Sequence, residues 1–193
     1  MTAPPGRRER KKAATRQKIA DTALALFLER GYEAVGIRDV AAAADVAVTT
    51  VFSHFAGKEA LVFEQDQEFQ QALTEAVTGR ARREPLIPLL REQVRALVRH
   101  CSAEGSAPTW RLITETPALR QYEESMRLRH AESLATALIE DPGLSASATT
   151  CRALARFTVE AFSLARGEAD PDAAVDEIFQ MIEAAWAATG DRH

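Results

Sequence analysis

Four small polar residues lie close together in the sequence and could contact another molecule: Thr49, Thr50, Ser53 and His54. In a helix over residues 48–54 they occupy one side, while Val51 lies on the other side with Phe55 just beyond it. A helix side that only faces water usually carries Glu and Lys. A helix that enters the DNA major groove instead needs slim hydrogen-bonding side chains near its N-terminus, and no carboxylate close to the phosphates. The composition therefore favours a DNA-contacting helix.

A second short helix precedes this one. Ile37, Val40, Ala41 and Ala44 recur at spacings of three and four, which predicts one buried helix face. Residues 45–47 form the turn, and Asp45 is among the few residue types that tolerate a left-handed backbone. The segment is thus expected to be a helix-turn-helix.

Four sequence motifs in fixed register carry a more specific likeness: Ala23-Leu24-x-Leu26-Phe27-x-x-Arg30-Gly31-Tyr32, Ile37-Arg38-Asp39-Val40-Ala41, Val46-x-x-x-Thr50-Val51-Phe52-x-x-Phe55 and Lys58-Glu59-x-Leu61. With them, residues 15–62 resemble the DNA-binding domain of the TetR/AcrR family of transcriptional regulators. The alternative is an ordinary bundle corner made of three small helices.

The resemblance implies which residues touch DNA. They lie in and around the second short helix and in the basic N-terminal arm: Lys12, Arg16, Arg38, Ala47, Val48, Thr49, Thr50, Phe52, Ser53, His54 and Lys58. Thr49, Thr50 and Ser53 would approach base edges or nearby phosphates, and the basic groups would hold backbone phosphates. The chain departs from the family pattern at Gly36, Asp45, Ala47, Phe52 and Gly57. At Gly36 and Ala47 a hydroxyl cap is missing, which costs about 1 kcal/mol at an alanine cap.

The charge distribution agrees with a nucleic-acid partner. Residues 1–18 hold seven Lys and Arg against one Glu, a net charge of +6, so the rest of the chain carries −10 to give the total of −4. All four lysines lie in the first 58 residues. A basic arm ahead of a helix-turn-helix is suited to neutralising phosphates, and the alternative is a solubilising tail.

The whole chain follows a helical pattern, with no predicted strand. We expect an all-α protein of about nine helices, with an N-terminal three-helix DNA-binding domain over 1–58 and a C-terminal ligand-binding and dimerisation domain over 59–193. The longer helices are expected at 9–30, 58–79, 86–104, 117–140, 147–166 and 171–189, with a short one around 110–115.

The C-terminal domain has two expected roles, both implied by the resemblance. Dimerisation through the last two helices is assigned to Phe157, Phe179, Ile182 and Trp186. A small-molecule pocket is assigned to Phe63, Phe69, Leu97, Cys101, Trp110, Ile113, Met126, His130 and Phe162. For each set the alternative is ordinary monomer core. Residues 111–119 also resemble actinobacterial regulators of the mycofactocin type, which favours an apolar or acyl-CoA-like effector.

Other classes of protein are disfavoured. No apolar run approaches 18 residues, so no membrane span is expected, and the basic N-terminus lacks the apolar region of a secretory signal. Cys101 and Cys151 are read as reduced thiols in the cytoplasm, with a redox pair as the alternative. The four histidines lack metal-ligand spacing, and no catalytic motif is present, so neither a metal, a cofactor nor an enzymatic activity is expected.

These observations converge on one function. The chain is expected to be a homodimeric repressor that binds a palindromic double-stranded DNA operator and is released by a small-molecule effector. The alternative is a helical small-molecule-binding protein whose DNA-reading function has degraded.

Overall fold

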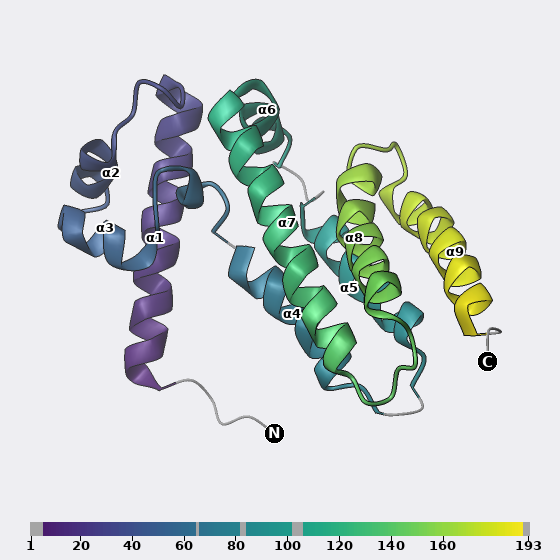
Figure 1. Ribbon diagram of the computed structural model, residues 1–193. Coiled ribbons are helices and arrows are strands. Elements are labelled where there is room, and N and C mark those ends of the chain that lie inside the picture. The colour runs from purple at the N-terminus through teal and green to yellow at the C-terminus, as the bar shows by residue number, and fades with distance from the viewer. Residues whose placement is uncertain (1–5, 65, 82–83, 102–105, 191–193) are drawn as a thin grey trace. The chain divides into compact units, whose positions relative to one another are not determined.

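The computed structural model describes residues 6–64, 66–81, 84–101 and 106–190. All regular elements in these ranges are helical (Figure 1), as the sequence predicts: α1 (Arg7–Arg30), α2 (Ile37–Ala43), α3 (Val48–His54), the 3-10 helix η1 (Glu59–Leu61), α4 (Asp66–Thr78), α5 (Leu86–Cys101), α6 (Ala107–Glu115), α7 (Pro117–Glu140), α8 (Ala148–Ala165) and α9 (Pro171–Gly190). The expected all-α class and its nine α-helices are confirmed for the described residues.

The chain divides into two compact units. The first comprises residues 1–65 and 107–122, and the second comprises residues 66–106 and 123–193. The division of functions at residues 58 and 59 stays a prediction.

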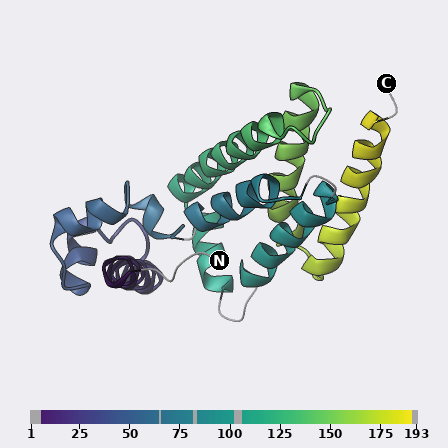
Figure 2. The same ribbon diagram turned by 90° about the horizontal axis from the view of Figure 1, so that it is seen from below.

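In the first unit, α1 is the helix on which the others pack. It contacts α2, η1 and α6, and α2 in turn contacts α3; Figure 2 views α1 nearly along its axis, with α2 and α3 beside it. Ile19 and Ala23 of α1, Val40 of α2 and Val51 of α3 are completely buried. Burying a side chain of the size of Ile or Val stabilises the fold by about 1.5–3 kcal/mol, so these contacts fix the helix-turn-helix on α1.

The turn between α2 and α3 has the predicted backbone. Asp45 has a φ of 52°, inside the left-handed region. The amide N–H of Val46 donates to the carbonyl oxygen of Ala41 at 3.0 Å, which satisfies one of the last carbonyl groups of α2. The turn therefore closes the helix-turn-helix without a glycine.

The prediction of a single helix over residues 58–79 is wrong. Instead η1 ends at Leu61, and α4 begins at Asp66. Phe63 leaves the helical path to become buried, with its ring stacked 5.4 Å from that of Tyr122. The carbonyl oxygen of Glu64 accepts a hydrogen bond from Arg16, as a carbonyl inside a continuous helix would not. Long-range contacts within the first unit therefore break the helix.

The other helix boundaries agree with the sequence to within a few residues. α1 begins two residues earlier than expected, and Ser147 caps α8 by accepting from the N–H of Thr150 at 3.1 Å. The last part of the helix expected over 86–104 falls in residues 102–105, outside the described ranges.

The second unit is a helical bundle in which α5 contacts α4, α8 and α9. Leu90, Val94 and Val98 of α5 are completely buried. A row of arginines on another side of α5 pairs with acids of α9: Arg91 with Glu183, Arg95 with Asp172 and Asp176, and Arg99 with Asp172. Apolar packing and ion pairs thus both attach α9 to α5. Across the described ranges, we find no helix with the length and apolar character needed to cross a membrane.

Candidate nucleic-acid interface

The α3 helix separates an anchoring side from a polar side. Val51 is completely buried and Phe55, the residue after the helix, is 3% exposed. Thr49 and Ser53 are exposed, whereas Thr50 and His54 are half-buried. The hydroxyl of Ser53 donates to the carbonyl oxygen of Thr50 at 2.7 Å. The apolar side therefore fixes the helix, and its short polar side chains face outward as the sequence predicts.

Phe52 adds an aromatic ring to this outward side. Its side chain is 56% exposed although no part of it is polar. An exposed phenyl ring on a helix of this kind is suited to contact the C5-methyl group of thymine, which projects into the major groove. Phe52 is thus suited to an apolar contact rather than to a hydrogen bond with a phosphate.

The start of each short helix lacks a side-chain hydroxyl cap. Neither Gly36 before α2 nor Ala47 before α3 has a side chain that caps the helix. At α2, the carboxylate of Asp39 reaches back and accepts a hydrogen bond from the N–H of Gly36 at 2.8 Å. Arg38 is exposed beside it, and Val48 is half-buried at the first position of α3. The α2 terminus is therefore held by an acid rather than by a hydroxyl.

Two predicted phosphate ligands bind their own chain. The guanidinium of Arg16 donates to the carbonyl oxygens of His54 and, at 2.9 Å, Glu64, and it lies 4.3 Å from the centre of the Phe55 ring. The ammonium of Lys58 donates to the carbonyl oxygen of Tyr32 and lies 3.9 Å from the centre of its ring. The geometry thus gives both residues a positioning role within the first unit.

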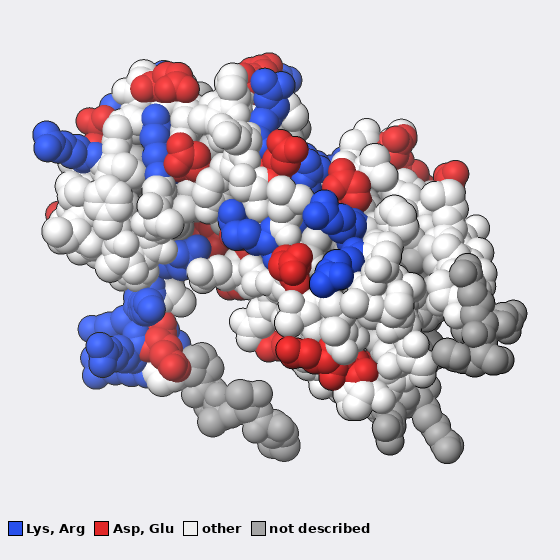
Figure 3. All heavy atoms as spheres, viewed as in Figure 1, with Lys and Arg blue, Asp and Glu red and all other residues white. Residues whose placement is uncertain are grey.

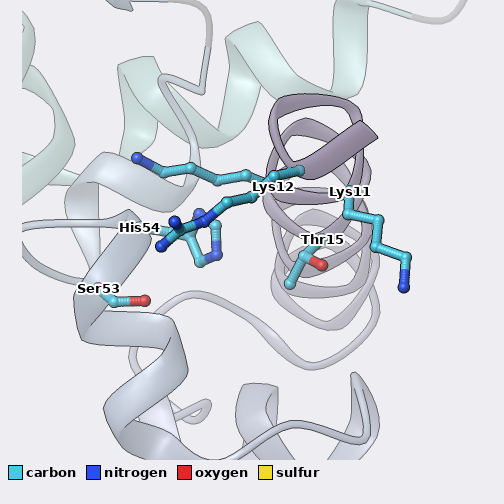
Figure 4. A pocket seen from close by; sticks show the side chains of 6 residues that line it. Lys11, Lys12, Thr15, Ser53 and His54 are labelled. Carbon is cyan, nitrogen blue, oxygen red and sulfur yellow. The ribbon is translucent and has the colours of Figure 1, made fainter. Parts of the chain in front are cut away.

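A basic hollow lies between the N-terminal half of α1 and the end of α3. Its lining residues are Arg8, Lys11, Lys12, Thr15, Ser53 and His54. Lys12 extends from α1 towards His54 in Figure 4, whereas Lys11 points to the opposite side of α1. Figure 3 shows one group of basic side chains at the N-terminal end of α1, with an acidic side chain beside it. None of the six lining residues is acidic, so the hollow is suited to an anionic group.

The sequence interpretation singled out Lys12, Ser53 and His54 but did not combine them with Arg8, Lys11 and Thr15. The helical spacing of these α1 residues could have shown that they belong together. Positions 8, 11, 12 and 15 follow spacings of three and four, so they share one face of α1. Only the packing of α1 against the helix-turn-helix shows that this face lies beside α3.

The surroundings of His54 disfavour the protonated form of its imidazole. Partial burial, followed by the positive charges of Lys12 and Arg16, lowers the pKa of His54 below its ordinary value. Its Nδ1 atom is buried and has no hydrogen-bond partner among the described residues. An imidazole with an unpartnered Nδ1 atom therefore borders a hollow lined by basic residues.

The residues assigned to a small-molecule pocket fall in both units. Phe63, Trp110 and Ile113 belong to the first unit, and Phe69, Leu97, Cys101, Met126, His130 and Phe162 belong to the second. In the second unit the ring of Phe69 lies 5.4 Å from that of His130 and 6.0 Å from that of Phe162. His130 is buried and hydrogen-bonded to Asp66. The structure thus brings three of the nine side chains into direct ring contact.

The cysteines are thiols, and burial raises the pKa of Cys101 to about 11. At neutral pH this thiol is protonated and a poor nucleophile. Within the described ranges, no group of three or more His, Cys, Asp or Glu side chains is arranged to hold a metal ion.

The four residues assigned to a dimer interface differ in exposure. Phe157 is 58% exposed and Trp186 is half-buried, but Phe179 and Ile182 are buried within the chain. Phe179 and Ile182 therefore belong to the core of the second unit, because α9 packs them against α5 and α8. Two residues outside the prediction, Leu164 and Met181, are 57% and 65% exposed on the same two helices.

Comparisons with known proteins agree with the geometry of the first unit. The family model described as bacterial regulatory proteins of the tetR family matches residues 19–64. TcmR, a helix-turn-helix transcriptional regulator of Streptomyces glaucescens, is 32% identical over 123 residues. Residues 19–64 therefore carry a DNA-binding domain of the TetR type. The TcmR match covers 60% of this chain and 54% of TcmR, so it spans about half the length of that relative.

Two further comparisons extend beyond the helix-turn-helix. MftR of Mycobacterium tuberculosis, named as a mycofactocin biosynthesis transcriptional regulator, is 28% identical over 126 residues, which cover 61% of this chain and 60% of MftR. The crystal structure of the TetR-family repressor AlkX from Dietzia sp. has a TM-score of 0.60 at 21% identity and covers 89% of this chain and 97% of AlkX. At that identity the likeness concerns the fold alone.

Proposed function

We propose that this TetR-family chain is a DNA-binding transcriptional repressor whose α3 helix reads a palindromic operator. The observation that carries the proposal is the outward side of α3. Exposed Thr49, Phe52 and Ser53 are held by the buried Val51, next to a hollow lined by basic residues. Short polar side chains and a phenyl ring suit base edges, and the basic groups suit the adjoining phosphates.

A mobility-shift assay on the DNA flanking the chain's own gene tests this function, at ~50 and ~200 mM salt. A specific shift that weakens steeply with salt is expected, because each phosphate contact releases counterions. Random-site selection extends the search if that DNA does not shift. Failure to retain any sequence above competitor DNA would favour the alternative of a small-molecule-binding protein.

The substitution Thr49→Glu probes the recognition helix directly. It places a carboxylate against DNA, and we expect a loss of affinity of about a hundredfold or more, since like charges brought together cost several kcal/mol. Thr136→Glu makes the same charge change at an exposed position of α7. Equal affinity of the two variants would exclude α3 as the reading helix, provided that both keep the helix content of the parent.

A homodimer is part of the proposal. Two recognition helices read a palindrome when they lie about one DNA turn apart (~34–36 Å) or a multiple of it. The exposed Phe157, Leu164 and Met181 on α8 and α9 are available for an interface with a second copy. Phe157→Glu is expected to give a monomer in light scattering. Leu128→Glu, at a leucine 49% exposed on α7, is the matched control and should leave the mass unchanged.

Release by a small molecule completes the proposal. The apolar residues assigned to the pocket, and the resemblance of residues 111–119 to mycofactocin-type regulators, support an apolar or acyl-CoA-like effector. AlkX, which shares the fold, is described as implicated in the biodegradation of n-alkanes. A thermal-shift screen of fatty acids and acyl-CoA thioesters, followed by the mobility shift, tests the idea. An effector is identified only if the compound both stabilises the protein and releases it from the DNA.

A further inference from the structure

The hollow between α1 and α3 has the lining that a phosphate diester requires. Arg8 and Lys12 supply positive charge, and Thr15 and Ser53 bring hydroxyl groups. Lys11 also lines the hollow, but its ammonium group points to the other side of α1. His54 is the sixth lining residue (Figure 4). Lys and Arg stay charged between pH 5.5 and 8.5, and hydroxyl groups stay neutral. His54 is therefore the lining residue whose charge can change in this range.

Contacts with Arg16 and Phe55 hold His54 in place. Its carbonyl oxygen accepts from the guanidinium of Arg16, and its ring lies 6.5 Å from the Phe55 ring. In the described part of the chain, the charged groups near it come from α1: Arg8, Lys12 and Arg16. No carboxylate offsets these charges in the hollow, so the unbound site disfavours an imidazolium ion.

We propose that a DNA phosphate entering this hollow is accompanied by a proton that binds His54, so that DNA affinity is linked to pH. The inference rests on the proposed DNA-binding function. Without DNA, burial and the neighbouring cations lower the pKa of His54. A phosphate in the hollow neutralises part of the positive potential and can accept a hydrogen bond from the imidazolium, and both effects raise this pKa. In the bound state His54 thus becomes a phosphate ligand.

The sign of the linkage follows from these two shifts. Between the lower pKa of the free chain and the higher pKa of the complex, binding takes up as much as one proton. The association constant therefore falls as pH rises, by at most about tenfold per pH unit. Above both pKa values His54 is neutral in both states and this contribution vanishes.

The test follows the imidazole signal of His54 by NMR as a function of pH, without and with duplex DNA. The signal is assigned by its loss in His54→Gln, and His100→Gln, at an exposed residue of α5, is the control. Two duplexes are used: one of arbitrary sequence at ~50 mM salt, since phosphate contacts need no sequence, and one obtained by random-site selection. The His54 midpoint should lie below about 6.5 in the free chain and rise by a unit or more in the complex.

Affinity measurements supply the second readout. The parent and His100→Gln should bind more tightly as pH falls from 8 to 6, whereas His54→Gln should lose that dependence. An unchanged His54 midpoint on a duplex that does bind would overturn the inference and leave the proposed function standing. Binding to arbitrary DNA with proton uptake, but with no sequence preferred, would overturn the operator proposal alone. Absence of binding to either duplex would overturn both.

Discussion

Replacing Arg16 with alanine is expected to loosen α3 and the segment that leads out of the first unit. The guanidinium joins the carbonyl oxygens of His54 and Glu64, which lie 38 and 48 residues further along the chain, and it covers the ring of Phe55. Alanine leaves both carbonyl groups without this donor. The contact also places a cation at the C-terminal end of α3, where it is favourable.

The magnitude follows from these contacts. A hydrogen bond from a charged donor contributes about 1.5–3 kcal/mol, and a partly exposed cation–π contact about 0.5–1 kcal/mol. Both hydrogen bonds are only partly buried. Water therefore replaces some of the lost interaction, and a net cost of about 2–4 kcal/mol is expected.

Hydrogen exchange read by mass spectrometry is the suitable assay, because the first unit need not unfold together with the second. Peptides that cover α3 and residues 59–64 should exchange faster in Arg16→Ala by a factor that corresponds to this cost. Arg10→Ala removes an equal charge from an exposed position of α1 and is the control. Arg16→Lys should give an intermediate result, since one ammonium cannot span both carbonyl groups as the planar guanidinium does. Equal exchange in Arg16→Ala and Arg10→Ala would refute the positioning role.

Three further predictions concern other parts of the chain. Gly31→Ala should lower the free energy of unfolding by about 1–3 kcal/mol in chemical denaturation, because Gly31 has a φ of 86° while no atom lies within 4 Å of an added Cβ. Gly167→Ala is the control and should be neutral or stabilising, since an added Cβ there makes only an ordinary contact of 3.8 Å with the carbonyl oxygen of Leu164. Arg95→Met should lower the stability of α9, measured by hydrogen exchange, by about 1 kcal/mol. The cost is small because the partners Asp172 and Asp176 are nearly half exposed to water. A difference between variant and parent that stays undiminished at 1 M salt would contradict an ionic origin. Phe52→Ala should weaken operator binding by about 1 kcal/mol. Replacing the contacted thymine with uracil removes its methyl group, and this change should weaken binding of the parent but not of the variant. If the losses from the protein change and the base change add up, a contact between the ring and the methyl group is excluded.

Local patterns in the sequence were sufficient for much of the fold. The helix-turn-helix, the left-handed Asp45 and the start of a helix near residue 147 depend on residues within a few positions of one another. The outward side of α3 was likewise predictable, because the helical period places its polar residues on one side and Val51 on the other. These features are decided by short-range sterics and periodicity.

Contacts between distant residues decided what the sequence did not show. The positive charge at Arg16 and Lys58 indicated phosphate ligands, but carbonyl oxygens and aromatic rings of the same chain occupy both groups. Phe179 satisfied the pattern of an interface residue, yet it is completely buried in one chain. A charged or apolar side chain specifies which kind of partner it prefers and leaves open whether that partner is internal or external.

The sequence by itself determined an all-helical chain with a helix-turn-helix motif and a basic N-terminal arm, because helical period, turn chemistry and charge are properties of short stretches. Only the tertiary structure placed Lys12 of α1 next to His54 of α3 and lowered the pKa of that histidine. Burial and electrostatic potential depend on groups brought together from distant positions, so they exist only once the helices have packed.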